Sequence, residues 1–205
     1  MITTVIFDIG NVLMRWNWRS TLARTYGEEK ARLIDKAVFR SGLWNEMDRG
    51  VLTMRDVRER AIAQFPECAT ELGPVFDDLG IFAERCSYAI PWINELRAAG
   101  YRVLYLSNYS HDLINLRPDV LDFLTYMDGG VFSCNVHLTK PEPAIYAAIC
   151  SIFRFKPDEG LFIDDNAANV EAAKAFGLNA IHFKEYEAVY SSVKDILKEK
   201  GLTTK

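Results

Sequence analysis

A short apolar run near the N-terminus ends in a single carboxylate. Residues 5–7 are all apolar and Asp8 follows them. The run is too short for a buried helix but suits a strand that is buried on both faces. The carboxyl ends of parallel strands form the ligand crevice of an open sheet, so Asp8 is placed for chemistry. An aspartate that merely begins a turn with Gly10 and Asn11 would account for the same residues.

The pattern becomes helical over residues 15–86. Apolar side chains recur at helical spacing within residues 28–41, and Thr53 followed by Asp56 resembles a helix-capping box. This stretch contains no good strand pattern. We therefore expect a small all-helical domain, which we call the cap, inserted after the first strand.

From Pro91 onward the chain alternates between helical and strand patterns. The predicted strands cover residues 101–106, 131–133, 160–163 and 179–183. Helical connections of this length imply right-handed crossovers and a parallel sheet. We predict an α/β fold in which residues 1–14 and 87–205 form a Rossmann-like core domain, with helices flanking the sheet, and residues 15–86 form the cap.

Composition and charge exclude several classes of protein. Of the 205 residues, 49% are hydrophobic and 25% are charged, which is typical of a folded domain. The net charge is −4 and no block of lysine and arginine occurs, so we expect no nucleic-acid partner. No apolar run approaches the ~20 residues that span a bilayer, so we expect no membrane partner.

The cysteines and the N-terminus bear on the compartment. The four cysteines lack the spacing of a metal site, and the first residues run into a strand without the features of a signal peptide. We expect reduced thiols and a cytoplasmic location. The sequence leaves the oligomeric state, monomer or dimer, open.

Polar residues recur where the predicted strands end. Ser107 and Asn108 follow one strand, the pair Asp164-Asp165 follows another, and Lys140 lies on a loop that can reach the same edge. Each has an ordinary explanation as a turn residue, a helix cap or a solvated loop charge. Their joint occurrence with Asp8 favours one catalytic site, because unrelated coincidences would otherwise be required.

Four short segments resemble those of the haloacid dehalogenase superfamily of hydrolases. They are residues 7–12 (Phe-Asp-Ile-Gly-Asn-Val), 107–108 (Ser-Asn), 140–142 (Lys-Pro-Glu) and 164–166 (Asp-Asp-Asn). The resemblance covers nearly the whole chain and is greatest for the bacterial α-D-glucose-1-phosphate phosphatase type. It implies a phosphomonoesterase whose partner is a small phosphorylated metabolite, such as a sugar phosphate.

The resemblance also implies roles for individual residues. Asp8 is the expected nucleophile, which forms an aspartyl-phosphate, and Lys140 is expected to neutralise the charge of Asp8 and of the phosphoryl group. Ser107 and the backbone of Asn108 are expected to hold a phosphoryl oxygen. Asn11 would offer a further amide at the same place.

The cofactor implied by the resemblance is Mg²⁺. Two anions approach each other only with a counter-charge between them, and Mg²⁺ prefers oxygen ligands. The expected ligands are Asp8, the backbone carbonyl of Gly10 and Asp165. Asp164 is expected to help through a water molecule or a hydrogen bond.

One position departs from most phosphatases of this superfamily, which carry a second aspartate where this chain has Gly10. That aspartate protonates the leaving oxygen and then activates water, and such help contributes ~10²–10⁴-fold to a rate. The glucose-1-phosphate phosphatase type also carries glycine here, which implies that activity survives the change. Candidates for the missing group are a bound water and a cap residue such as Asp48.

Two other functions fit these segments in part. A 2-haloacid dehalogenase uses its first aspartate on carbon without a metal, but typically has serines where this chain has Asp164 and Asp165. Two extra carboxylates would repel a carboxylate substrate. A catalytically degenerate binding module would have no need of Lys140 and both acids. The sequence therefore favours the phosphatase.

Aromatic residues near the start of the predicted cap have two interpretations. Trp16, Trp18 and Trp44, together with Met47, are able to line a pocket between the cap and the core domain. Such side chains more often form the core of a small lobe. For Trp44 we favour the second interpretation.

Overall fold

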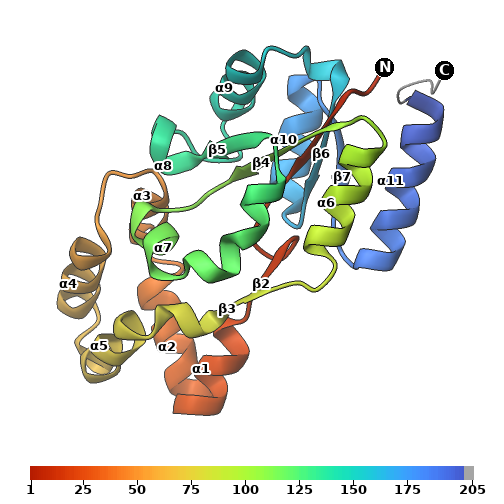
Figure 1. The fold of residues 1–205 in the computed structure, drawn as a ribbon. Helices are drawn as coiled ribbons and strands as arrows, with labels where there is room; N and C mark the ends of the chain where they lie inside the picture. Colours follow the sequence, from red (N-terminus) through yellow and green to blue (C-terminus); the bar gives the residue numbers. More distant parts are fainter. Residues whose placement is uncertain (201–205) are drawn as a thin grey trace.

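The computed structural model describes residues 1–200 and confirms an α/β fold built on a parallel five-stranded sheet (Figure 1). The strands are β1 (Thr4–Phe7), β4 (Arg102–Ser107), β5 (Gly129–Phe132), β6 (Gly160–Asp164) and β7 (Asn179–His182). Their order is β5-β4-β1-β6-β7, so the first strand of the chain lies at the centre. Residues 201–205 of the predicted core domain lie outside the described range.

Helices cover both faces of the sheet, which explains the continuous apolar run in β1. The side chains of Val5 and Phe7 join a core cluster with residues of α6 (Ala89–Ala98) and α11 (Tyr186–Lys200). Ile6 points the other way, into a cluster with α9 (Pro143–Phe153) and α10 (Ala167–Phe176). Both faces of the central strand are thus buried, and the sequence of such a strand does not alternate between apolar and polar residues.

The register of the sheet brings the polar strand ends together. Phe7 of β1 pairs with Tyr105 of β4 on one side and with Ile163 of β6 on the other. Because the three strands are parallel and in this register, the residues that follow them emerge at one edge. Ser107 at the end of β4, Asp8 just after β1, and Asp164 and Asp165 at the end of β6 are neighbours for this reason.

Most of the chain between β1 and α6 is helical. The helices are α1 (Trp18–Tyr26), α2 (Glu28–Val38), α3 (Leu43–Asp48), α4 (Met54–Gln64) and α5 (Ala69–Asp77). The predicted capping box of α4 is present: Oγ1 of Thr53 accepts from the N–H of Asp56 at 3.1 Å, and the Asp56 carboxylate accepts from the N–H of Thr53 at 2.8 Å. None of the helices within residues 1–200 has both the length and the apolar character needed to cross a bilayer.

The expectation that residues 15–86 are entirely helical is wrong at both ends of the stretch. β2 (Met14–Trp16) pairs antiparallel with β3 (Ala83–Arg85), so the two connections to the rest of the chain run side by side. Three-residue strands contain too few positions for an alternating pattern to appear in the sequence. Their pairing depends on a partner that is remote along the chain.

The turn after α3 comes very close to the rest of the protein. Gly50 has a φ of +75°, and a Cβ atom there would lie 2.9 Å from the backbone oxygen of Cys134, in α8 (Ser133–Val136). Gly42, just before α3, also has a positive φ of +83°, but a Cβ atom there would meet nothing within 4 Å. Comparing substitutions at the two glycines therefore separates the effect of a left-handed backbone, which both share, from that of the close contact with Cys134, which Gly50 alone of the two makes.

We predict that Gly50→Ala destabilises the protein more than Gly42→Ala does. Each substitution should cost about 1–2 kcal/mol for placing a side chain on left-handed backbone. At Gly50 overpacking against backbone should add about 1–3 kcal/mol. Urea unfolding of the two variants beside the wild type measures this difference, and equal losses would show that the turn can move away from Cys134.

Candidate active site

Asp8 follows β1 at the centre of the sheet edge. Its backbone N–H donates to the carbonyl of Ile163 at 2.9 Å, and its own Oδ1 accepts from the N–H of Ile9 at 2.7 Å. The residue is only 7% exposed. Backbone hydrogen bonds therefore hold a largely buried carboxylate at the carboxyl end of the central strand.

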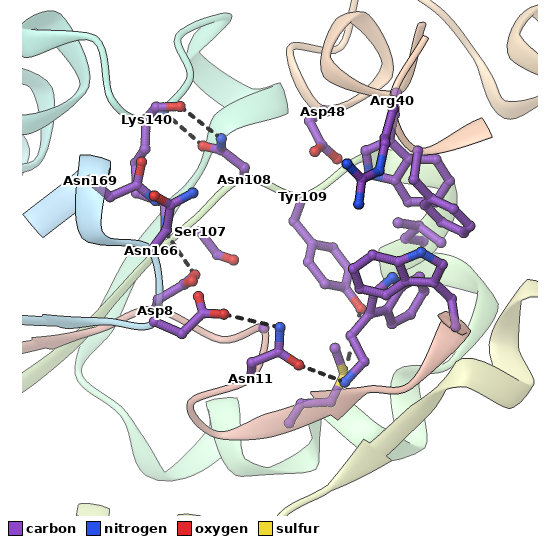
Figure 2. A pocket seen from close by; sticks show the side chains of 18 of the residues that line it. Asp8, Asn11, Arg40, Asp48, Ser107, Asn108, Tyr109, Lys140, Asn166 and Asn169 are labelled. Carbon is purple, nitrogen blue, oxygen red and sulfur yellow. Dashed lines mark hydrogen bonds and ion pairs between the residues drawn. The ribbon is translucent and has the colours of Figure 1, made fainter. Parts of the chain in front are cut away.

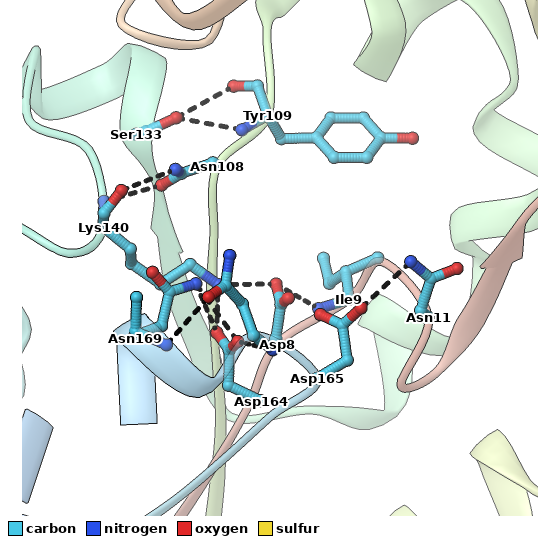
Figure 3. A network of polar contacts seen from close by, with 12 residues as sticks. Asp8, Ile9, Asn11, Asn108, Tyr109, Ser133, Lys140, Asp164, Asp165 and Asn169 are labelled. Atoms are coloured by element: carbon cyan, nitrogen blue, oxygen red, sulfur yellow. Dashed lines mark hydrogen bonds and ion pairs between the residues drawn. The ribbon is translucent and has the colours of Figure 1, made fainter. Parts of the chain in front are cut away.

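Lys140 brings a buried ammonium group to the same edge, on the loop between α8 and α9. Its Nζ lies 2.8 Å from Oδ1 of Asp8 and 2.7 Å from Oδ2 of Asp164 (Figure 3). Burial by itself would lower the pKa of Lys140, but the two carboxylates raise that pKa above its ordinary value. The ammonium therefore remains charged between two acids that lie far from it in the sequence.

Asn108 orients the loop that carries Lys140. Its side chain accepts from the backbone N–H of Lys140 at 2.8 Å and donates to the Lys140 carbonyl at 3.0 Å. The sequence suggested a contact of the Asn108 backbone with phosphate, and this side-chain role was missed. Ser107, at the end of β4, is 2% exposed and lines the same cavity as Asp8.

Asp164 is completely buried, and protein donors occupy both of its oxygens. Oδ1 accepts from the N–H of Asn166 at 2.7 Å, and the Asn169 amide lies 3.1 Å from each oxygen. Asn169 was also missed from the sequence. The available signal was its position in the first turn of α10, the helix that begins at this edge.

Asp165 lies nearer the opening and connects with the loop after β1. Its Oδ2 accepts from Nδ2 of Asn11 at 3.1 Å (Figure 3). Oδ1 of Asn11 accepts from the N–H of Trp16 at 3.1 Å. Asn11 has a φ of +55°, a conformation that asparagine adopts more readily than most residues. Asn11 therefore links the acidic pair to the strand that leads into the cap.

The donor set of this cluster fits a divalent cation. Carboxylate oxygens of Asp8, Asp164 and Asp165 all lie within 4.8 Å of one another. Burial raises the pKa of Asp8 to about 7, with Asp164 and Asp165 adding to the effect and Lys140 opposing it. Burial likewise raises the pKa of Asp165. Among the described residues, Lys140 is the one ammonium that pairs with these three carboxylates, and the excess of oxygen ligands and negative charge suits Mg²⁺.

A cavity of about 400 Å³ lies over this cluster, between the core and the predicted cap (Figure 2). Asp8, Ser107 and Lys140 are among the residues on its core side. Its other side is aromatic and basic, and is formed by Trp16, Trp18, Arg19, Phe39, Arg40 and Trp44. The site therefore combines a charged floor with walls that suit an organic group.

Trp18 and Trp44 both line the cavity and make contacts within the helical stretch, so each fits both interpretations of the sequence. Trp44 packs with its ring centroid 4.7 Å from that of Phe39 and also lines the cavity, so it is not solely a core residue. Trp18 donates from its indole N–H to Asp35 at 2.7 Å while it lines the cavity. Met47 is fully buried among the core residues.

Curated relatives include two fungal proteins and bacterial dehalogenases. The chain is 24% identical over 213 residues to a drimenol cyclase of Aspergillus calidoustus, and the match covers 98% of this chain and 38% of the cyclase. It is 26% identical over 93 residues to an (S)-2-haloacid dehalogenase of Pseudomonas sp., covering 45% of this chain and 41% of that enzyme. The chain thus spans about two fifths of the length of these relatives.

A further relative matches along nearly its whole length. A sesquiterpene phosphatase of Aspergillus oryzae is 23% identical over 194 residues, with 94% of this chain and 95% of that protein covered.

Solved structures show the same fold. A predicted haloacid dehalogenase (HAD)-like hydrolase from Porphyromonas gingivalis superposes with a TM-score of 0.77 at 24% identity. The match covers 98% of this chain and 100% of that chain. A HAD family enzyme from Bacteroides thetaiotaomicron, crystallised with magnesium and inorganic phosphate, gives a TM-score of 0.73 at 18% identity, covering 93% and 100%.

The family is established by a match over most of the sequence. The family model described as haloacid dehalogenase-like hydrolase matches residues 2–177, which include β1, the helical stretch after it and the strands up to β6. Asp8, Lys140, Asp164 and Asp165 all fall within the matched range. The chain therefore belongs to the haloacid dehalogenase-like hydrolase family.

Proposed function

We propose that this chain is a Mg²⁺-dependent phosphomonoesterase that hydrolyses a small phosphorylated metabolite through an aspartyl-phosphate on Asp8. The observation that carries the proposal is the buried pairing of Asp8 with Lys140 beside two further acids, on the floor of a cavity. A carboxylate nucleophile divides a difficult displacement at phosphorus into two easier steps. The magnesium and phosphate in the Bacteroides neighbour support this choice.

The proposed roles follow from the position of each group. Asp8 attacks phosphorus, and the Lys140 ammonium offsets the charge of both reacting anions. The Ser107 hydroxyl and the Asn108 backbone amide hold a phosphoryl oxygen, and the Asn11 amide faces the same space. Asp164 holds Lys140 in place through its own ion pair.

The metal ligands that we propose are Asp8, the backbone carbonyl of Gly10 and Asp165. Asp164 acts behind them, because donors of the protein already occupy its oxygens. When bound, the cation neutralises the charge of the phosphoryl group as it approaches Asp8.

A dehalogenase is the nearest alternative, since relatives of that kind match part of the chain. The charge of the site argues against it. Asp164 and Asp165 lie within 4.8 Å of the Asp8 carboxylate, and within residues 1–200 Lys140 is the one cation that forms ion pairs with this group of acids. A haloacid carries its own carboxylate and would be repelled, whereas acids that surround a divalent cation are useful.

For the substrate we propose a sugar phosphate, such as glucose 1-phosphate. Aromatic rings in the cavity wall stack against the apolar face of a sugar, and Arg19 and Arg40 supply donors for its hydroxyl groups. The anomeric oxygen of a sugar 1-phosphate is a less basic leaving group than an ordinary alcohol, which suits a site with Gly10. The same aromatic wall also suits an isoprenoid monophosphate, which the sesquiterpene phosphatase relative makes the second candidate.

The proposed activity predicts phosphate release from a panel of phosphomonoesters with Mg²⁺ present. The panel contains sugar 1-phosphates and 6-phosphates and an isoprenoid monophosphate, with 2-chloropropionate as a further substrate. Asp8→Asn should lower the rate by ~10³-fold or more, because the nucleophile is lost. Asp158→Asn is the matched control: it changes an exposed aspartate just before β6, at the opposite end of that strand, and should leave the rate unchanged.

Three results would contradict this prediction in different ways. Undiminished turnover by Asp8→Asn, with a circular dichroism spectrum like that of the wild type, would refute the nucleophile. Chloride release from 2-chloropropionate that is insensitive to chelator would identify a dehalogenase. Failure to hydrolyse any phosphomonoester in the panel would leave a binding module.

The metal proposal predicts that Mg²⁺ stabilises the folded protein. A ligand that binds only the folded state adds about 2.7 kcal/mol of stability when present at 100 times its dissociation constant. Asp165→Asn should remove most of this gain, measured as the shift in thermal midpoint on adding MgCl₂. Glu171→Gln, an exposed acid of α10 paired with Lys174, should keep it. An equal shift in both variants would place the metal elsewhere.

A further inference from the structure

Asp48, the last residue of α3, is a buried carboxylate to which the proposed function assigns no role. The residue is only 7% exposed and lines the cavity (Figure 2). Among residues 1–200, its Oδ1 atom has no hydrogen-bond partner. A buried polar atom without a partner is costly, and native proteins rarely keep one. A group that enters the cavity would give this oxygen its missing partner.

The position of Asp48 matches the side from which a leaving group departs. Asp48 lies across the cavity from Asp8 (Figure 2). In a displacement at phosphorus, the attacking and leaving oxygens are roughly in line, so attack by Asp8 drives the leaving oxygen away from the core. Gly10 offers no side chain there, and a Cβ atom at Gly10 would meet nothing within 4 Å. The Asp48 carboxyl faces this space from the other wall.

The backbone around Asp48 is fixed to the core. The Ser133 hydroxyl donates to the carbonyl of Asp48 and accepts from the N–H of Tyr109 at 2.9 Å. The guanidinium of Arg49, the next residue, forms an ion pair with Glu142 and donates to the carbonyl of His137 at 3.1 Å. These contacts, together with the close approach of Gly50 to Cys134, hold the Asp48 carboxyl at a set place in the cavity.

The surroundings of Asp48 favour its protonated form. Burial raises the pKa of Asp48 to about 8, with Asp8 adding to the effect and Lys140 opposing it. Tyr109 and Cys134 also interact electrostatically with Asp48. A carboxyl that holds its proton near neutral pH is suited to donate it to a leaving oxygen.

We propose that Asp48 is the general acid and then the general base of the proposed phosphatase reaction. It would take the role of the aspartate that most phosphatases of this superfamily carry at the position of Gly10. This inference rests on the proposed function.

In the first step Asp8 forms a bond to phosphorus and the bond to the leaving oxygen breaks. Asp48 gives its proton to that oxygen, so the alcohol leaves neutral and Asp48 becomes a carboxylate. In the second step Asp48 takes a proton from water as the water oxygen attacks phosphorus. The bond to Asp8 then breaks, which releases phosphate, restores the Asp8 carboxylate and leaves Asp48 protonated.

Asp48→Asn tests this role, because the amide has the same size and cannot transfer the proton. For the best sugar or alkyl phosphate of the panel, kcat/KM should fall ~10²–10⁴-fold. For p-nitrophenyl phosphate, whose leaving group departs as a stable anion, kcat/KM should fall less than ~10-fold. Its kcat should fall more, and an initial burst of p-nitrophenol should appear, because hydrolysis of the aspartyl-phosphate lacks its base. Glu46→Gln, a half-exposed acid on the same helix, is the matched control and should behave as the wild type.

The outcomes separate this inference from the proposed function. Equal losses of kcat/KM on both substrates would assign Asp48 to binding or structure, and wild-type values on both would leave it without a role in catalysis. Either result overturns the inference while the phosphatase activity stands. If the wild-type protein hydrolyses no phosphomonoester, the proposed function and this inference fail together.

The same variant predicts a pH-dependent gain in stability. The folded-state pKa of Asp48, about 8, is raised above its ordinary value of 3.8, so ionisation of Asp48 costs stability progressively as pH rises between these values. Asp48→Asn removes this cost. Its thermal midpoint should therefore exceed that of the wild type at pH 8, with a smaller difference at pH 5. A midpoint below that of the wild type at both pH values would mark Asp48 as a structural residue and overturn the inference.

Discussion

The pairing of one buried ammonium with two buried carboxylates is the constraint around which the site is built. Lys140 lies between Asp8, which directly follows β1, and Asp164, which is the last residue of β6. Removing charges from water is expensive, so such a group persists only where the opposite charges are close and well hydrogen-bonded. Here the N–H of Ile9 supplies a further hydrogen bond to Asp8, and the N–H of Asn166 and the Asn169 amide supply further hydrogen bonds to Asp164. The compensation stays incomplete, because three acids face one ammonium, and that imbalance suits the proposed cation.

The cavity divides the proposed chemistry between two parts of the chain. The sheet edge carries the groups that would receive the phosphoryl group, and the helical stretch carries the aromatic wall and Asp48. The pairing of β2 with β3 and the contacts of Arg49 and Gly50 hold these parts together. Asp48 can give a proton to the leaving oxygen only if the distance between its wall of the cavity and Asp8 stays constant. In the proposed reaction, the contacts that anchor the backbone next to Asp48 would therefore matter for catalysis as well as for stability.

The family permits two reactions that begin alike, since an aspartate nucleophile can attack phosphorus or carbon. Relatives of both kinds match this chain, and similarity alone does not separate them. The charge around Asp8 is the physical basis on which we propose a phosphatase. Acids beside Asp8 favour a reaction in which a divalent cation offsets the charge of a dianionic phosphoryl group. In the proposed reaction, the aromatic wall would help to select which phosphomonoester enters the cavity.

Local pattern was sufficient for much of this structure. The apolar run before Asp8 predicted a central strand, the Thr53 and Asp56 pair predicted a helix start, and alternation predicted the parallel sheet whose edge collects Asp8 and the later acids. Tertiary structure alone decided the β2–β3 pairing and the hydrogen bonds of the Asn108 side chain to the Lys140 backbone. It also decided that Oδ1 of Asp48 has no hydrogen-bond partner within residues 1–200. Periodicity and capping depend on neighbours a few positions apart, so the sequence displays them. A hydrogen bond across 32 positions, or the absence of one in a cavity, depends on how distant segments pack and leaves no local pattern.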